Sequence, residues 1–230
     1  MTARYALNRS YNIPAVRLFV EDVGIEQSWD FVRSLGITSI GPEDANSSTG
    51  VIGGLYQGTT VEEMTNAFGS IANGGMFNDA YMIEKILDSN GNLIYEHPKT
   101  PERVFSEETA FLMTDMMRTV ISDPVATAAD LRSAFKHYGE IPVVGKTGST
   151  QGDGDAWFIG YSPDITVGVW VGYEHQIHTL ETPAARARAK TIWAKVMDMA
   201  AEMKPDLMAT TEFTKPENVV RSSISAIAKI

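Results

Sequence analysis

Lysine, threonine and serine side chains stand close together in the segment Lys146-Thr147-Gly148-Ser149. An ammonium group beside hydroxyls is a suitable receptor for a carboxylate, because charge-assisted hydrogen bonds are short and strong. The small residue Gly148 lets the backbone of a ligand approach closely. This residue pattern therefore indicates a site for an anionic ligand, which is either a carboxylate or a phosphate.

The glycine spacing argues against a phosphate loop. Such a loop needs a glycine four residues before Gly-Lys-Thr and a helix directly after it. Gly139 leaves five residues before Gly145, and "GSTQGDGDAW" holds three glycines and two aspartates. That continuation starts a helix poorly, and its carboxylates repel phosphate. A nucleoside triphosphatase is thus disfavoured, and the sequence favours a carboxylate site.

The first part of the chain, residues 1–140, is predicted to be mainly helical. Glycines end two amphipathic stretches, and a loop follows over residues 36–58. Thr60 with Glu63 forms a capping box that opens a third helix, which ends at Gly74-Gly75. Ser106 caps a fourth helix through about Ile121, and a further helix is expected over residues 126–137.

A hairpin interrupts these helices near residues 81–96. The run "YMIEKILDSNGNLIYEHP" places Asn90-Gly91, a strong signal for a type I′ turn, between two β-rich stretches. Residues 141–230 then hold "IPVVGKTGST", "DAWFIGYSP" and "ITVGVWVGYE", which are expected to form an antiparallel meander. In an extended strand, Lys146 and Gly148 point to one face of the sheet and Thr147 and Ser149 to the other, so a twist or the open edge must bring the ammonium and the hydroxyls together near a ligand.

A long helix is predicted after the meander, opening at Thr182-Pro183. Its apolar stripe is expected to pack on the sheet and consists of Ile192, Trp193, Val196, Met197 and Ala200. The whole chain, residues 1–230, is therefore expected to be one α+β domain, with a helical part and an antiparallel sheet covered by a C-terminal helix.

Composition excludes several functions. The net charge of −10 argues against nucleic acid as a partner, because phosphate contacts need clustered Lys and Arg. The absence of cysteine excludes disulfides and thiolate catalysis. His175 and His178 lack a third ligand, so no metal and no cofactor is expected. No apolar run reaches the roughly 18 residues that span a bilayer, so a membrane anchor would belong to sequence outside this chain.

A second motif near the start accompanies the Lys-Thr-Gly segment. Ser10-Tyr11-Asn12 lies in "ALNRSYNIPAVRL", and Ser-x-Asn and Lys-Thr-Gly occur together in penicillin-binding proteins and serine β-lactamases. The stretches "TTVEEMTNAFGSIANGG", "GKTGSTQGDGDAWFIGYSPD" and "FTKPENVV" follow in the order of one family. From about Arg4 to Val220 the chain resembles the transpeptidase domain of bifunctional (class A) penicillin-binding proteins.

This resemblance implies the fold and a role for each site residue. Ser10 would pass protons to the leaving amine, and Asn12 would hydrogen-bond the amide of the donor peptide. Lys146 would complete the electrostatic field around Ser10. Substrate binding would fall to Thr147, Gly148 and Ser149. The implied ligands are the peptidoglycan stem peptide and β-lactam antibiotics, at the extracytoplasmic face of the bacterial cytoplasmic membrane.

Simpler interpretations of the same residues stay open from sequence. Ser10 could be an ordinary helix cap, and Lys146 could be a solvated charge at the end of a strand. A second functional hypothesis is a module that binds wall peptide or β-lactam without catalysis.

The nucleophile of the family has no counterpart in its usual place. A serine three residues before a lysine should precede the Ser-x-Asn element. The match Ser133-Ala134-Phe135-Lys136 follows it instead, so we interpret it as a chance match on a surface helix. The chain is therefore expected to be the C-terminal portion of the domain, incomplete at the N-terminal side and inactive alone. The missing N-terminal segment is its expected partner, because that segment supplies the first sheet strands.

Overall fold

Helices dominate the first half of the chain in the computed structural model, which describes residues 1–175 and 177–222. The expected capping box is present, because the Thr60 side chain accepts from the amide of Glu63 while the Glu63 carboxylate accepts from that of Thr60. The helices are α1 (Ala3–Asn8), α2 (Asn12–Arg17), a π-helical turn (Leu18–Val23), α3 (Ile25–Ser34), α4 (Val61–Ala72) and α5 (Glu107–Ser122).

The expected antiparallel meander forms the sheet. Its strands lie in the order β5 (Val144–Ser149), β6 (Asp155–Tyr161) and β7 (Thr166–Gly172). Val144 is opposite Tyr161 on β6, and Trp157 is opposite Trp170 on β7. Within the described residues β5 and β7 are each paired on one side only, so both are edge strands.

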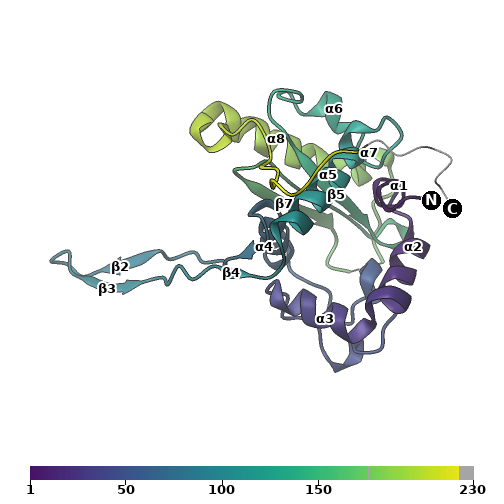
Figure 1. Cartoon of the computed structure of the whole chain (residues 1–230), viewed down its shortest axis with the longest axis horizontal. Coiled ribbons are helices and arrows are strands. Elements are labelled where there is room, and N and C mark those ends of the chain that lie inside the picture. The colour runs from purple at the N-terminus through teal and green to yellow at the C-terminus, as the bar shows by residue number, and fades with distance from the viewer. Residues whose placement is uncertain (176, 223–230) are drawn as a thin grey trace.

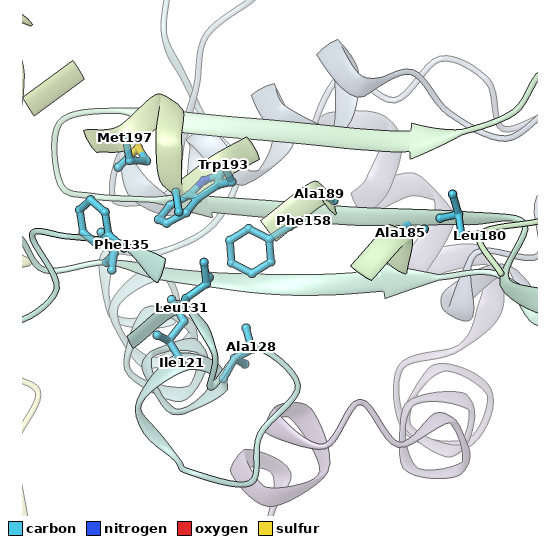
Figure 2. Packing of buried hydrophobic residues seen from close by; sticks show 14 of the residues in the cluster. Ile121, Ala128, Leu131, Phe135, Phe158, Leu180, Ala185, Ala189, Trp193 and Met197 are labelled. Carbon is cyan, nitrogen blue, oxygen red and sulfur yellow. The ribbon is translucent and has the colours of Figure 1, made fainter. Parts of the chain in front are cut away.

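Layers of helices cover both faces of the sheet (Figure 1). One face carries α8 (Arg188–Met203), and the ring of Trp193 meets those of Phe158 and Phe135 at centroid distances of 5.1 and 5.9 Å. Figure 2 shows these rings gathered between α8 and the strands. On the other face, Val144 and Tyr161 pack with Met117 of α5. The α+β class is confirmed by this mixture of helices and antiparallel strands.

Two helix predictions near this core were wrong in detail. Between residues 126 and 137 only α6 (Leu131–Ala134) is helical, and a short α7 (Pro183–Arg186) is separate from α8.

On α8, Ile192 and Val196 are 43% and 40% exposed. Asp198 is buried and accepts a hydrogen bond from the amide of Lys136, so the segment after α6 covers that side of α8. The buried stripe is rotated accordingly and consists of Ala189, Trp193, Ala194, Met197 and Asp198.

The predicted hairpin projects from the body of the molecule (Figure 1). It pairs β2 (Lys85–Leu87) with β3 (Leu93–Glu96), and β1 (Met76–Phe77) with β4 (Glu102–Arg103) forms its base. The type I′ turn is wrong, because Gly91 has a positive φ but Asn90 does not. The Asp88 carboxylate instead accepts from the amides of Asn90 and Asn92, and the register shifts beside the turn.

In the described part of the chain, no helix combines the length and apolar character needed to cross a membrane.

Candidate active site at the edge of the sheet

The Ser-x-Asn and Lys-Thr-Gly segments meet at the edge of the sheet although they are far apart in sequence. Lys146, on β5, donates from Nζ to Oγ of Ser10 at 2.7 Å and to the carbonyl of Thr147 at 2.9 Å. Ser10 follows α1, and the turn after it leads into α2. The two elements that the sequence singled out therefore form one site.

Ser10 adopts a backbone conformation that serine rarely has. Its φ is 55°, in the left-handed region that favours glycine. The amide of Ser10 donates to the carbonyl of Leu7 and that of Tyr11 to the carbonyl of Ala6, as in a Schellman motif. Ser10 thus occupies the position just past a helix end where glycine is usual. Its side chain caps no amide and turns to Lys146 instead.

Lys146 is not the solvated strand-end charge of the simpler interpretation. Burial lowers the pKa of Lys146 from 10.5 to about 8, because removing an ammonium from water disfavours its charged form. The described residues place no carboxylate in an ion pair with this ammonium. A lysine whose pKa lies nearer to neutrality gives up its proton more easily than an ordinary lysine, which suits acid–base chemistry.

The remaining predicted residues surround this pair. Asn12 is the first residue of α2 and Ser149 the last of β5, and both are exposed. Thr147 donates from Oγ1 to Oγ1 of Thr127 at 2.8 Å. A Cβ on Gly148 would lie 3.1 Å from Cβ of Trp157, closer than normal packing allows. Contact with the neighbouring strand is thus a second reason for glycine at this position.

Thr127 is a site residue that sequence reasoning missed. It lies in "VATAAD", where no motif marks it and a helix was expected. Only the fold brings it next to Thr147, because the segment that follows α5 turns back across the end of β5.

The Ser133–Lys136 match lies outside this site. Ser133 donates from Oγ to the carbonyl of Asp130, and Lys136 forms an ion pair with Glu202 at 3.0 Å. The Glu202 carboxylate raises the pKa of Lys136, the opposite of what activates a lysine base. These contacts support the interpretation of a chance match.

Two shallow cavities lie elsewhere, between α4 and β7 or the turn before it. Their volumes are about 360 and 350 Å³, and Asn66, Gly69 and Thr166 line both. Neither is lined by Ser10 or Lys146. Among residues 1–175 and 177–222, no three His, Asp or Glu side chains cluster as metal ligands would.

The structure thus combines an α+β fold with a serine and a half-buried lysine in contact at a sheet edge. The chain belongs to the penicillin-binding protein transpeptidase domain family, which matches residues 1–198.

The chain is similar in sequence to penicillin-binding proteins of two bacteria. Penicillin-binding protein 1A of Aquifex aeolicus is 31% identical over 96% of the chain, and penicillin-binding protein 1F of Bacillus subtilis is 30% identical over 95%. The chain spans only 28% and 29% of the length of these two proteins.

Solved structures show the same fold. Penicillin-binding protein 1A of Haemophilus influenzae has a TM-score of 0.78 at 23% identity, over 98% of this chain and 37% of that one. PonA1 of Mycobacterium tuberculosis, in complex with penicillin V, has a TM-score of 0.76 at 24% identity, over 95% of this chain and 60% of that one.

Proposed function

We propose that the chain is the part of a serine D,D-transpeptidase that holds the donor stem peptide and moves protons during peptidoglycan cross-linking. The 2.7 Å contact between Lys146 and Ser10 at an open strand edge carries this proposal. Family membership supports it, since the fold alone would not assign an activity.

The proposed reaction passes through an acyl-enzyme. A serine oxygen bonds to the penultimate D-alanine carbonyl carbon, and terminal D-alanine leaves after its amine takes a proton. An amine of a second stem peptide then takes the acyl group and frees the serine. Ser10, with Lys146 beside it, delivers the proton to the leaving amine, and Asn12 binds the donor amide.

The donor carboxylate is proposed to bind along the end of β5. Ser149 offers an exposed hydroxyl there, Lys146 offers the positive charge, and Gly148 leaves the strand surface flat. Thr147 would join them by turning its hydroxyl proton from Thr127 to the carboxylate. β-Lactams mimic the donor and would occupy the same place. PonA1 forms a complex with one of them, penicillin V.

The nucleophilic serine is proposed to come from a segment outside these 230 residues, because the internal Ser133–Lys136 match is engaged elsewhere. That segment has a surface to pack on. The outer edge of β7 lacks a partner among the described strands. On the adjoining helix α8, Ile192, Val196 and Met199 are exposed. A strand and helix laid there would satisfy the edge and cover the apolar side chains.

The cellular setting follows from the substrate. Stem peptides are cross-linked outside the cytoplasmic membrane, so we place the domain at its extracytoplasmic face, with the anchor in another part of the protein. The net charge of −10 speaks against a nucleic-acid partner.

A non-catalytic module for wall peptide or β-lactam is the second candidate. It is favoured by one observation, namely that Ser10 and Lys146 are in contact while Ser133 and Lys136 of the described residues are engaged elsewhere.

Intact-mass spectrometry after incubation of this chain with penicillin tests the proposal. We expect no covalent adduct. A stoichiometric adduct that maps to Ser133 or Ser10 would contradict it. Fluorescence anisotropy of a labelled penicillin measures the reversible binding that both candidates allow, which should weaken in Lys146→Ala but not in Lys136→Ala. The two candidates separate when a family segment with Ser-x-x-Lys is added, because only the transpeptidase part then becomes acylated.

A further inference from the structure

The segment of residues 123–130 lies next to the candidate site and is here called the strap. It connects α5 to α6. Ala128 fixes its middle, since this residue is fully buried and its amide donates to the carbonyl of Val120 at 3.1 Å. Asp123 fixes its start by accepting from Nδ2 of Asn8 at 3.1 Å.

Thr127 of the strap makes three hydrogen bonds to three separate elements. Its amide donates to the carbonyl of Asn8 on α1 at 3.2 Å. Its Oγ1 accepts from Oγ1 of Thr147 on β5 at 2.8 Å. Its carbonyl accepts from Nζ of Lys190 on α8 at 3.1 Å. No other residue of the strap touches α1, β5 and α8 together through hydrogen bonds in the described part of the chain.

Two of these elements, α1 and β5, hold the candidate catalytic pair. Asn8 lies two residues before Ser10, and Thr147 directly follows Lys146. We propose, on the basis of the function proposed above, that Thr127 is a positioning residue that sets the separation of Ser10 and Lys146 and the orientation of the Thr147 hydroxyl. It contacts no reacting atom and acts through its neighbours.

Lys190 holds the strap in place against α8. Its side chain is 16% exposed, and its Nζ also donates to the Asp130 carboxylate at 2.8 Å. Bonds to both a carbonyl and a carboxylate of the strap fix it against α8, which is part of the core. The strap thus holds Thr127 at a fixed position relative to the core, and Thr127 in turn contacts the site.

Loss of the Thr127 hydroxyl is expected to change the pKa of Lys146. Thr147 is half-buried and gives its hydroxyl proton to Thr127. Without that acceptor the hydroxyl draws in water, because a buried donor without a partner is costly. Thr147 also loses its anchor, and its carbonyl, which accepts from Nζ of Lys146, moves with it. Water that then reaches the ammonium stabilises its charged form, and the pKa of Lys146 rises toward its ordinary value.

The test is titration of Lys146 in the full chain by NMR of labelled lysine, in the wild type and three variants. Thr127→Val removes the hydroxyl and keeps the shape, whereas Thr127→Ser keeps the hydroxyl. Thr114→Val is the matched control, because it breaks another buried threonine bond, the 2.7 Å contact with the Tyr161 hydroxyl, away from the strap.

We expect Thr127→Val to raise the pKa of Lys146 by about one unit, in keeping with partial rehydration of a buried ammonium. Thr127→Ser should keep the wild-type pKa, and Thr114→Val should lower Tm without changing that pKa. An unchanged pKa in Thr127→Val, or equal changes in Thr127→Val and Thr127→Ser, would overturn the inference. This titration needs no ligand, so its outcome is separate from that of the penicillin experiment.

Discussion

The core around Trp193 and the site around Ser10 differ in what their residues contribute to stability. In the core, Trp193, Phe158 and Phe135 are buried and meet edge to face, an arrangement that aromatic rings favour. At the site, Ser10 has a left-handed backbone, and Lys146 is a half-buried lysine without a counter-charge among its described contacts. Both site features oppose folding.

This difference indicates which residues are present for folding and which for function. Proteins tolerate strained or desolvated groups where function needs them, and the rest of the fold compensates. Substitutions at the two regions should therefore change stability in opposite directions.

Loss of the central core ring has the largest expected effect. Trp193→Ala should lower the free energy of unfolding by about 3–5 kcal/mol, because a fully buried aromatic side chain leaves a cavity. Urea unfolding measures this loss in the free energy of unfolding. Trp170→Ala is the control, since Trp170 is 39% exposed and should cost less than half as much. Equal losses in both variants would remove the distinction between core and edge.

Removal of the buried ammonium should act in the opposite direction. Lys146→Met should raise the free energy of unfolding at pH 7 by about 1–3 kcal/mol, because a desolvated charge is replaced by an apolar chain. Lys136→Met, at an exposed ion pair, should change it by less than about 0.5 kcal/mol.

The pH dependence of this gain follows from the pKa of Lys146. The folded pKa of about 8 lies below the ordinary 10.5, so between these values the unfolded chain binds more protons. Wild-type stability therefore rises with pH through this window. The advantage of Lys146→Met should be largest below pH 8 and shrink toward pH 10.5. A difference that stays constant over this range would mean that Lys146 is solvated.

The backbone of Ser10 gives the smallest of these effects. Ser10→Gly should stabilise the chain by about 0.5–1 kcal/mol, because relief of left-handed strain exceeds the entropy cost of glycine. Ser10→Ala keeps the strain and should bring no gain. Thermal unfolding of both variants compares them. A gain in Ser10→Ala alone would show that the strain argument is wrong.

Local signals in the sequence predicted the elements well. The Thr60–Glu63 capping box and the Ser106 cap both lie within one helical turn of the residues they bond, so they depend little on the rest of the fold. The three strand runs were also found, because turns of a few residues join them in sequence order. The roles of Ser10 and Lys146 were inferred through a family resemblance, and the two side chains are in contact.

Features that depend on tertiary contact were missed. Ile192 and Val196 fit the period of a buried stripe, but the segment after α6 decides which side of α8 is covered. The contact between Thr127 and Thr147 joins residues that are 20 apart in sequence, and no residue type announces it. The left-handed φ of Ser10 was equally invisible, since glycine is the residue that normally marks such a position.

The most direct test of the account is acylation of this chain after it is extended at its N-terminus by a family segment that carries Ser-x-x-Lys. Acylation by fluorescent penicillin should be detected only when this segment is present. Its rate should fall roughly 100-fold or more in Lys146→Ala, as expected for loss of a group that stabilises charge in the transition state. Lys136→Ala should match the unmodified extended chain. Equal labelling in the Lys146 and Lys136 variants would contradict the claim that Ser10 and Lys146 form the active site.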